Sequence, residues 1–236
     1  MLRTQTVCVP NRLLSSLPVE DYLRLFTECE SVELQFADVL YHAGEVIRYV
    51  YFPTGSFISS LTTLERGIHL EVGLIGNEGM LGVTLVLENL TSPFHALVQG
   101  AGPALRIPVD EFLQRLEDCS ALKGMLKRYL YMSMIQLARS GACNRFHVVE
   151  ARLARWLLMT QDRAHSETFY ITHVFLAYML GVRRVGITKA ANALQRRNLI
   201  SYHRGYITVL DRSGLERVAC GCYHAEKAIY EQILGG

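Results

Sequence analysis

Side chains that could contact a polyanion are concentrated in the last third of the chain. Residues 181–200, GVRRVGITKAANALQRRNLI, place one arginine pair directly after a glycine-containing turn and a second pair further along. Arginine and lysine contact DNA phosphates, and an arginine can also donate two hydrogen bonds to O6 and N7 of a guanine. The alternative is a basic helix face exposed to solvent, and an arginine pair alone favours that alternative.

The sequence around the first pair predicts a helix-turn-helix. The hydroxyl of Thr172 can cap a first helix, and Gly181 can end it. A second helix is expected from about Arg183. The apolar positions that would bury the two helices are Leu176, Ala177 and Leu180 in the first and Ile187, Ala191 and Leu194 in the second.

The exposed side of the second helix is the expected base-reading surface. Arg184, Val185 and Lys189 fall within one arc opposite the apolar stripe, at the end of the helix that enters the major groove in this motif. Two strand-like runs, 199–202 and 206–210, follow and form a hairpin with a basic tip, so the whole segment predicts a winged helix. The complete set of predicted DNA-binding residues is Thr172, Arg183, Arg184, Val185, Thr188, Lys189, Arg196, Arg197, His203 and Arg204.

The charge distribution points the same way. Residues 1–144 hold 11 Lys and Arg against 15 Asp and Glu, a net charge of −4, whereas residues 145–236 hold 13 against 7, a net charge of +6. A basic rear half next to an acidic front half is typical of a protein whose rear half meets a polyanion. A chance imbalance is the alternative for so small an excess.

The elements in front of this segment predict a small β module and a long helix. Between about residues 32 and 110, short runs rich in Val, Ile, Leu, Tyr and Phe alternate with glycine-containing turns, which is typical of an antiparallel β-roll or jelly roll. A helix of about five turns follows, either as a core helix or as a dimer seam. Its predicted dimerisation residues are Leu122, Met125, Leu126, Tyr129, Leu130, Met132, Ser133 and Leu137.

We therefore expect an α+β chain with three parts: a β-roll over residues 1–118, a candidate dimerisation helix over 119–145 and a winged helix-turn-helix over 146–236. No segment is apolar enough to span a membrane, and the first ten residues lack the apolar core of a secretory signal, so a cytoplasmic location is expected.

The six cysteines are expected to be free thiols. Cys220 and Cys222 form the only close pair, followed by His224. Two thiols that are two residues apart on a helix point roughly 200° away from each other, which makes a poor chelate. No metal site is therefore predicted.

The chain resembles the CRP/FNR family of bacterial transcription regulators. The resemblance is carried by LAYMLGVRRVGITKAANALQRRNLISYHRGYITVLDRSGLE in the rear half and by YVYFPTGSFISSL and EVGLIGNEGMLGV in the front half. It implies a homodimer that places two recognition helices in successive major grooves of a near-palindromic site on double-stranded DNA. Val185 stands where the family often has Glu, which implies a different target sequence. RNA polymerase is a further candidate partner.

The resemblance also locates a candidate effector pocket, at Glu71, Gly82, Val83, Phe94 and His95. Family members that bind cyclic AMP have a glutamate where this chain has Val83 and an arginine near Phe94 and His95. Without that arginine a buried cyclic phosphate would have no partner, which argues against cyclic AMP.

Other cofactors are left open by the sequence. Cys8 and Cys29 are too far apart for the N-terminal iron–sulfur motif of the family's oxygen-sensing branch. Haem stays an alternative, because His42, His69 and His95 all lie in the β module, although a lone histidine is more often structural. The identity of any effector is therefore unknown.

The sequence thus predicts a DNA-binding regulator with a degenerate or re-purposed sensor. Two alternatives are a ligand-sensing module that acts through protein contacts and a regulator of the same kind that binds haem or another small molecule. No catalytic triad, phosphate loop or pair of carboxylates is found that would place an active site, so no enzymatic activity is expected.

Overall fold

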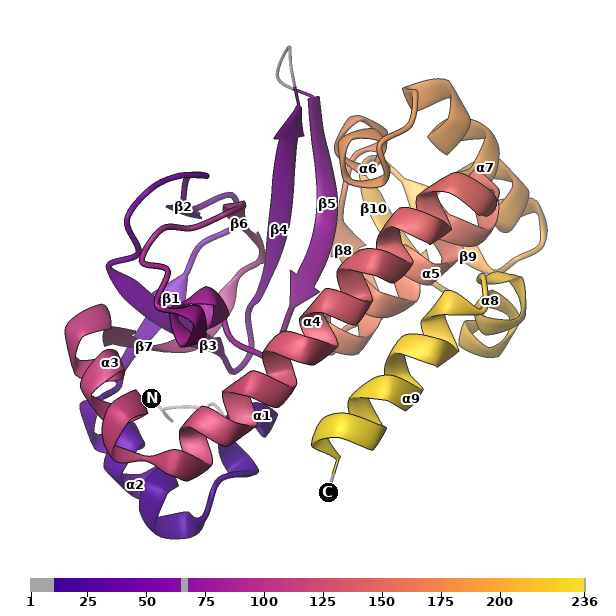
Figure 1. Cartoon of the computed structure of the whole chain (residues 1–236). Coiled ribbons are helices and arrows are strands. Elements are labelled where there is room, and N and C mark those ends of the chain that lie inside the picture. Colours follow the sequence, from indigo (N-terminus) through magenta and orange to yellow (C-terminus); the bar gives the residue numbers. More distant parts are fainter. Residues whose placement is uncertain (1–10, 65–67, 236) are drawn as a thin grey trace, which may run out of the picture.

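The computed structural model describes residues 11–64 and 68–235 (Figure 1). The front half contains two antiparallel sheets, one with strand order β1-β7-β3 and one with order β2-β6-β4-β5. Their strands are β1 (Glu30–Leu34), β2 (Val39–Tyr41), β3 (Tyr49–Pro53), β4 (Phe57–Leu64), β5 (Ile68–Ile75), β6 (His95–Gly100) and β7 (Gly102–Pro108).

Short helices surround these sheets. They are α1 (Arg12–Ser15), α2 (Val19–Glu28), the 3₁₀ helix η2 (Val83–Leu87) and α3 (Val109–Asp118). Alternate residues of each strand point to the same side of the sheet, and their apolar side chains pack with those of the helices in a single core. This core includes Phe52, Ile58, Val98, Ile107 and Phe112. The predicted small β module is therefore present, with its helices on the outside.

Helix α4 (Ser120–Phe146) crosses from the front half to the rear half (Figure 1). Its first turns are held in the front core by buried side chains, and its last turns lie beside the rear half. Within the described part of the chain, no helix is long and apolar enough to span a membrane.

The rear half is a winged helix. Its helices are α5 (Val149–Ala164), α6 (His173–Leu180), α7 (Arg184–Arg196), α8 (Arg212–Val218) and α9 (Cys222–Leu234). The strands β8 (Thr168–Tyr170), β9 (Ile200–His203) and β10 (Tyr206–Val209) form an antiparallel sheet in the order β8-β10-β9. The predicted fold class, an α+β chain with an N-terminal β domain, a long helix and a C-terminal helix-turn-helix domain, is confirmed.

The hydrophobic core of the rear half extends into the front half. Phe57, Leu61 and Leu74, which belong to β4 and β5, are buried together with Trp156 and Leu157 of α5. In Figure 1 the β4–β5 hairpin accordingly stands between the rest of the sheets and the rear helices. The two halves therefore share a wall of apolar side chains.

Candidate nucleic-acid interface

Helices α6 and α7 form the predicted helix-turn-helix. The Thr172 hydroxyl accepts a hydrogen bond from the Phe175 amide at 3.2 Å and caps α6. Gly181, with φ +59°, ends α6 in a left-handed conformation that glycine adopts without the steric cost of a Cβ. Buried apolar residues then hold both helices on the core: Leu176, Met179, Leu180, Ile187, Ala190, Ala191 and Leu194.

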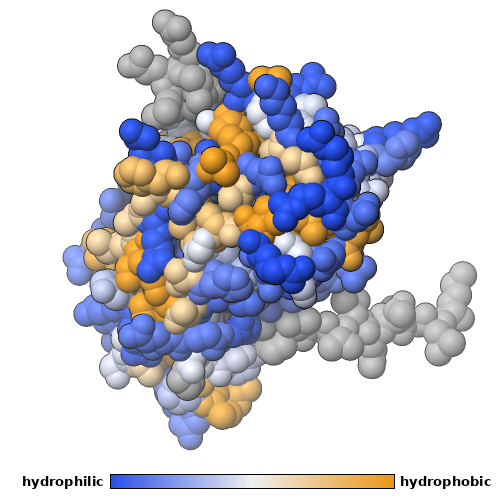
Figure 2. Space-filling view, turned by 90° about the vertical axis from the view of Figure 1, so that its right-hand side faces the viewer, coloured by the Kyte–Doolittle hydropathy of each residue, from blue (hydrophilic) through white to orange (hydrophobic). Residues whose placement is uncertain are grey.

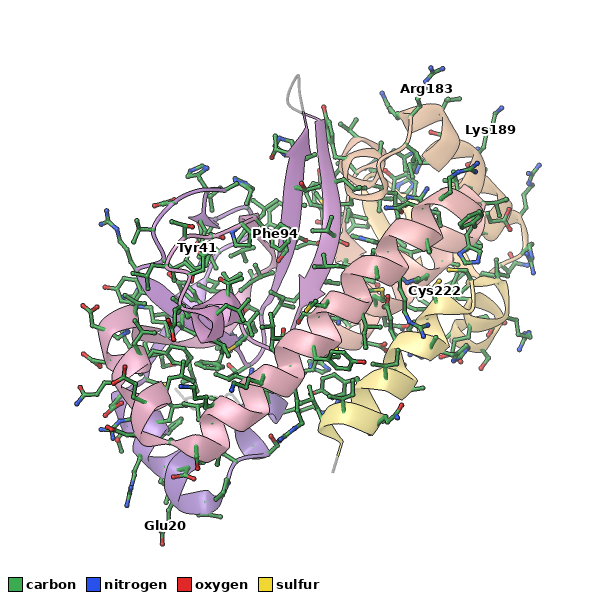
Figure 3. The ribbon with its side chains drawn as sticks, in the orientation of Figure 1. Glu20, Tyr41, Phe94, Arg183, Lys189 and Cys222 are labelled. Atoms are coloured by element: carbon green, nitrogen blue, oxygen red, sulfur yellow. The ribbon has the colours of Figure 1, made fainter. Side chains whose placement is uncertain are left out.

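The first turns of α7 project an unpaired basic surface. Arg183, the N-cap residue, and Arg184 and Lys189 are all exposed. In Figure 3 the side chains of Arg183 and Lys189 point away from the body of the protein. Within residues 11–64 and 68–235, no acidic side chain forms an ion pair with these three cations. Val185 lies among them and is 59% exposed, so a flat apolar contact is available next to the charges.

Thr188 lies on α7 between Arg184 and Lys189, and two polar contacts within the protein fix its side chain. Its hydroxyl donates to the Arg184 carbonyl at 3.1 Å and lies 3.1 Å from Nδ1 of His173. The His173 ring stacks on Tyr202 of β9, with 4.3 Å between ring centroids. Burial, together with the charge of Arg184, lowers the pKa of His173, which favours the neutral ring. His173 therefore links α6, α7 and the wing, a role that the sequence did not indicate.

The wing presents the predicted basic tip. His203 pairs with Tyr206 across the hairpin, so Arg204 and Gly205 form a two-residue loop, with φ values of +49° and +87°. Positive φ at both positions is typical of a type I′ turn, whose twist matches that of the strands. A Cβ on Gly205 would lie 2.6 Å from the Tyr170 ring, so only glycine fits at this position. His203 and Arg204 are exposed at the tip.

The second arginine pair lies at the far end of α7. Arg196 is exposed, and Arg197 forms an ion pair with Glu150 at 3.3 Å while it remains half exposed. In Figure 2, which views this side of the molecule, hydrophilic side chains cover most of the surface between smaller apolar patches. Arg197 thus has an ion-pair partner, whereas Arg183, Arg184 and Lys189 have none among the residues that the structure describes.

A buried arginine connects the reading motif to the long helix. Arg152 of α5 is 5% exposed, and its guanidinium donates to the Leu180 carbonyl at the end of α6 and to Asn144 Oδ1 of α4, the latter at 2.6 Å. A buried guanidinium that satisfies carbonyl and amide oxygens fixes their separation. The position of α6 is therefore coupled to that of the last turns of α4.

The predicted effector residues fall into two groups. Gly82, Val83 and Phe94 line a cavity of about 80 Å³ between the sheets and α4, together with Ser133 and Leu137. The residues that line this cavity include neither a charged side chain nor a histidine.

Glu71 and His95 lie outside this cavity. The Glu71 carboxylate accepts hydrogen bonds from the Ser59 hydroxyl at 2.7 Å and from the Trp156 indole at 2.9 Å. The His95 ring lies between His42 and His69, with centroid distances of 5.1 and 6.1 Å. Strand alternation places Glu71 on one face of β5 and its cavity-lining neighbour Val72 on the other.

The predicted dimerisation residues also divide by exposure. Leu122, Met125, Leu126, Tyr129 and Met132 are buried in the front core of their own chain. Leu130 and Ser133 are half-buried, and Leu137 is exposed. In the middle of α4 the large apolar side chains turned to solvent are Tyr131 and Met134, each 59% exposed, together with Leu137, and Phe146 is exposed at the end of the helix.

Comparisons with known proteins agree with this geometry. Residues 151–218 match the Crp-like helix-turn-helix domain. Among solved structures, FixK2 from Bradyrhizobium japonicum is similar, with a TM-score of 0.69, 12% identity and coverage of 82% of this chain and 98% of that one. A CRP/FNR family regulator from Eubacterium rectale has a TM-score of 0.69, 14% identity and coverage of 87% and 96%.

The c-di-GMP-responsive global regulator CLP from Xanthomonas campestris has a TM-score of 0.67, 13% identity and coverage of 81% and 99%. Identities this low establish the fold alone, and comparison with curated protein sequences finds no match. The matched domain carries the reading helix and the wing, and the shared fold covers most of the chain. Residues 151–218 therefore form a Crp-like helix-turn-helix domain, and the chain shares its fold with these solved structures.

Proposed function

We propose that the chain works as a homodimer that recognises a near-palindromic DNA site through α7 and contacts phosphates through the wing. CRP/FNR regulators are not enzymes, and the proposed function is therefore DNA binding and not catalysis. The observation that carries the proposal is the cluster of exposed cations without ion-pair partners, Arg183, Arg184 and Lys189, at the end of α7 that enters the groove in this motif. We assign contacts with base edges to Arg184 and Lys189. Contacts with DNA phosphates are assigned to Arg183, Arg196 and Arg204.

The dimer contact is assigned to the exposed stripe on α4. Tyr131, Met134 and Leu137 recur every three residues, with Leu130 at the edge of the stripe, and would pack against the same stripe of a second copy. This refines the set expected from the sequence, because the buried members hold α4 to its own sensor half. We propose three functional parts: the sensor β-roll (residues 1–118), the dimerisation helix (119–145) and the winged helix-turn-helix (146–236).

We propose that the sensor half binds either an uncharged effector or no effector. A cyclic phosphate in the cavity beside Val83 and Phe94 would be desolvated without a charged partner, a cost of several kcal/mol by order of magnitude. Cyclic dinucleotides, which carry two phosphates, meet the same objection. The cavity also offers no histidine to a haem iron, and at about 80 Å³ it is smaller than the ~300 Å³ at which ligand pockets usually begin.

The test is a double substitution, Arg184→Ala with Lys189→Ala. Duplexes bound by the wild-type protein would first be selected from a random pool, and affinities then measured by fluorescence anisotropy. Because each base contact contributes ~1–3 kcal/mol, we expect the affinity for the selected site to fall by ~10²-fold or more. RNA polymerase is a further proposed partner of the DNA-bound dimer.

The matched control is Arg24→Ala with Lys123→Ala, which removes two exposed cations, one from α2 and one from the first turn of α4. Arg24 belongs to α2, the helix that contains Glu20, and in Figure 3 this helix lies at the opposite end of the molecule from Arg183. The control should bind DNA within about twofold of wild type. Unchanged binding by the Arg184 and Lys189 variant would contradict the proposal and favour a module that acts through protein contacts.

A further inference from the structure

Four side chains with metal-binding atoms converge where the long helix meets the winged helix. Cys143 lies in the last turn of α4 and His147 directly follows that helix, while Cys220 and Cys222 flank Gly221 at the start of α9. The three sulfurs and one imidazole nitrogen all lie within 4.8 Å of one another. In Figure 3, Cys222 lies at the start of α9, beside α5.

The convergence depends on a turn that the sequence did not reveal. A continuous helix through Cys220 and Cys222 would have separated their thiols, but α9 begins only at Cys222 and Gly221 is its N-cap. The Cys220 amide bonds to the Ala151 carbonyl of α5 at 3.4 Å, which fixes the turn. His224, which follows the pair in sequence, packs edge-on against Tyr223 and is not a member of the cluster.

Two of the distances within the cluster are close to those of a tetrahedral site, and all the others are within 4.8 Å. Zinc–sulfur and zinc–nitrogen bonds of ~2.3 and ~2.0 Å imply separations of about 3.8 Å between two sulfurs and about 3.5 Å between sulfur and nitrogen. Cys143 Sγ lies 3.5 Å from Cys220 Sγ, and Cys222 Sγ lies 3.7 Å from Nδ1 of His147. We propose that Cys143, His147, Cys220 and Cys222 bind one Zn²⁺ ion as a Cys₃His structural site.

The surroundings favour this ion. Three thiolates and Zn²⁺ carry a net charge of −1, and Arg155 places its Nη1 atom 4.0 Å from the Cys143 sulfur while it pairs with Glu226. Soft thiolates with one imidazole in a tetrahedron select zinc among the common divalent ions. Iron–sulfur clusters contain two or four irons and spread their ligands further than the 4.8 Å observed here.

The position of the site gives the ion a mechanical role. His147 is the link between α4 and α5, and α9 lies along α4. One ion would therefore join the end of the long helix, the start of the DNA-binding domain and the α8–α9 turn. It would fix the angle at which the DNA-binding domain leaves α4. The site itself is independent of the proposed DNA recognition, because metal binding can be measured without DNA.

The test uses the full-length protein, reduced and stripped of metal with a chelator. Zn²⁺ binding would be measured by competition with a chromophoric chelator, and Co²⁺ binding by its thiolate charge-transfer bands and the visible bands of tetrahedral cobalt. We expect one equivalent of either ion per chain. Cys222→Ser and His147→Gln should lower the Zn²⁺ affinity by at least ~100-fold.

The control is Cys119→Ser, which removes a thiol outside the cluster and retains its capping bond to the Leu122 amide. This variant should bind Zn²⁺ as wild type does. Because His147 is exposed, His147→Gln should fold normally even if a cysteine variant does not. Failure of the reduced wild type to bind Zn²⁺ or Co²⁺, unchanged affinity in His147→Gln, or purification with iron and sulfide would each overturn the proposal.

Discussion

The indole N–H of Trp156 donates a hydrogen bond to the carboxylate of Glu71 at 2.9 Å, and this bond joins α5 of the DNA-binding domain to β5 of the sensor sheet. The same carboxylate accepts from the Ser59 hydroxyl at 2.7 Å. Because burial disfavours the charged form of this carboxyl group, its pKa is raised from 4.5 to about 7. The contact between the two halves therefore contains a group that titrates near neutral pH.

Replacing Glu71 with Gln should change how stability depends on pH. In the wild type, the unfolded chain loses this proton from about pH 4.5 upward, while the folded protein keeps it until about pH 7. The contribution of Glu71 is thus greatest at low pH and falls by up to about 3 kcal/mol as pH rises to 7. Glu71→Gln keeps hydrogen-bonding groups for Trp156 and Ser59 and removes this decline.

The measurement is urea unfolding followed by the fluorescence of Trp156, the only tryptophan, between pH 5 and pH 8. The difference in unfolding free energy between variant and wild type should grow in favour of the variant as the pH rises. A difference that is constant with pH would contradict the pKa assigned to Glu71. Glu33→Gln, on the exposed side of β1, removes a carboxylate elsewhere in the sensor sheets and is the control.

DNA binding by the dimer should depend strongly on salt. Each phosphate that a cation neutralises releases condensed counterions, so log K falls with log salt by ~0.9 per contact. Contacts to roughly five to nine phosphates predict a slope of about −4 to −8. The slope would be measured by anisotropy with a fixed duplex at several salt concentrations, and a slope near zero would contradict the assignment of Arg183, Arg196 and Arg204 to phosphates.

Arg204→Asn should separate the stability of the wing from its binding. Arg204 has φ +49°, a left-handed conformation that asparagine adopts more readily than arginine. We expect the unfolding free energy to rise by up to ~1 kcal/mol, seen as a Tm higher by about 2–4 °C. The slope of log K against log salt should become less steep by about 2, because each protomer of the dimer loses one cation. Equal slopes for wild type and variant would remove the wing tip from the interface.

Met134→Glu should weaken the dimer. A charge in the middle of the exposed stripe on α4 would be buried twice in a symmetric interface, so the dimer dissociation constant should rise by ~100-fold or more. Analytical ultracentrifugation would measure this. Gln114→Glu on the exposed side of α3 adds the same charge elsewhere and should leave the dimer intact. A wild-type protein that is monomeric at micromolar concentration would contradict the assignment of this stripe.

Val185→Glu should change the preferred sequence rather than the general affinity. Valine can touch a thymine methyl group, whereas glutamate accepts a hydrogen bond from N4 of cytosine. Selection from a random duplex pool with each protein should replace a thymine by a cytosine in each half-site. Identical consensus sequences would show that Val185 does not face a base.

The sequence was sufficient where local patterns decide the structure. The cap at Thr172, the stop at Gly181 and the apolar stripe on α7 are all short-range signals, and each is present in the structure. The hairpin loop at Arg204 and Gly205 is equally local, because two positive φ values are set by neighbouring residues. The fold class and the winged helix followed from these signals.

Contacts between distant segments could not be read in the same way. A helical stripe on α4 does not tell which side meets the chain's own sheets, so the sequence left open whether Leu122 and Tyr129 belong to the core or to a dimer seam. The family resemblance placed Glu71 in one pocket with Val83, although the alternation of β5 turns Glu71 toward Trp156. The cysteine cluster depends on residues 143 and 220 meeting in space, 77 positions apart in the chain.

The apolar wall formed by Phe57, Leu61 and Leu74 has a consequence for how the molecule comes apart. A fragment that starts after the long helix would lack these three side chains and would leave Trp156 and Leu157 facing water. We therefore expect the DNA-binding domain to melt together with the β4–β5 hairpin, in one calorimetric peak. Any distortion of the β4–β5 hairpin would therefore change the surface on which the domain that carries α7 rests.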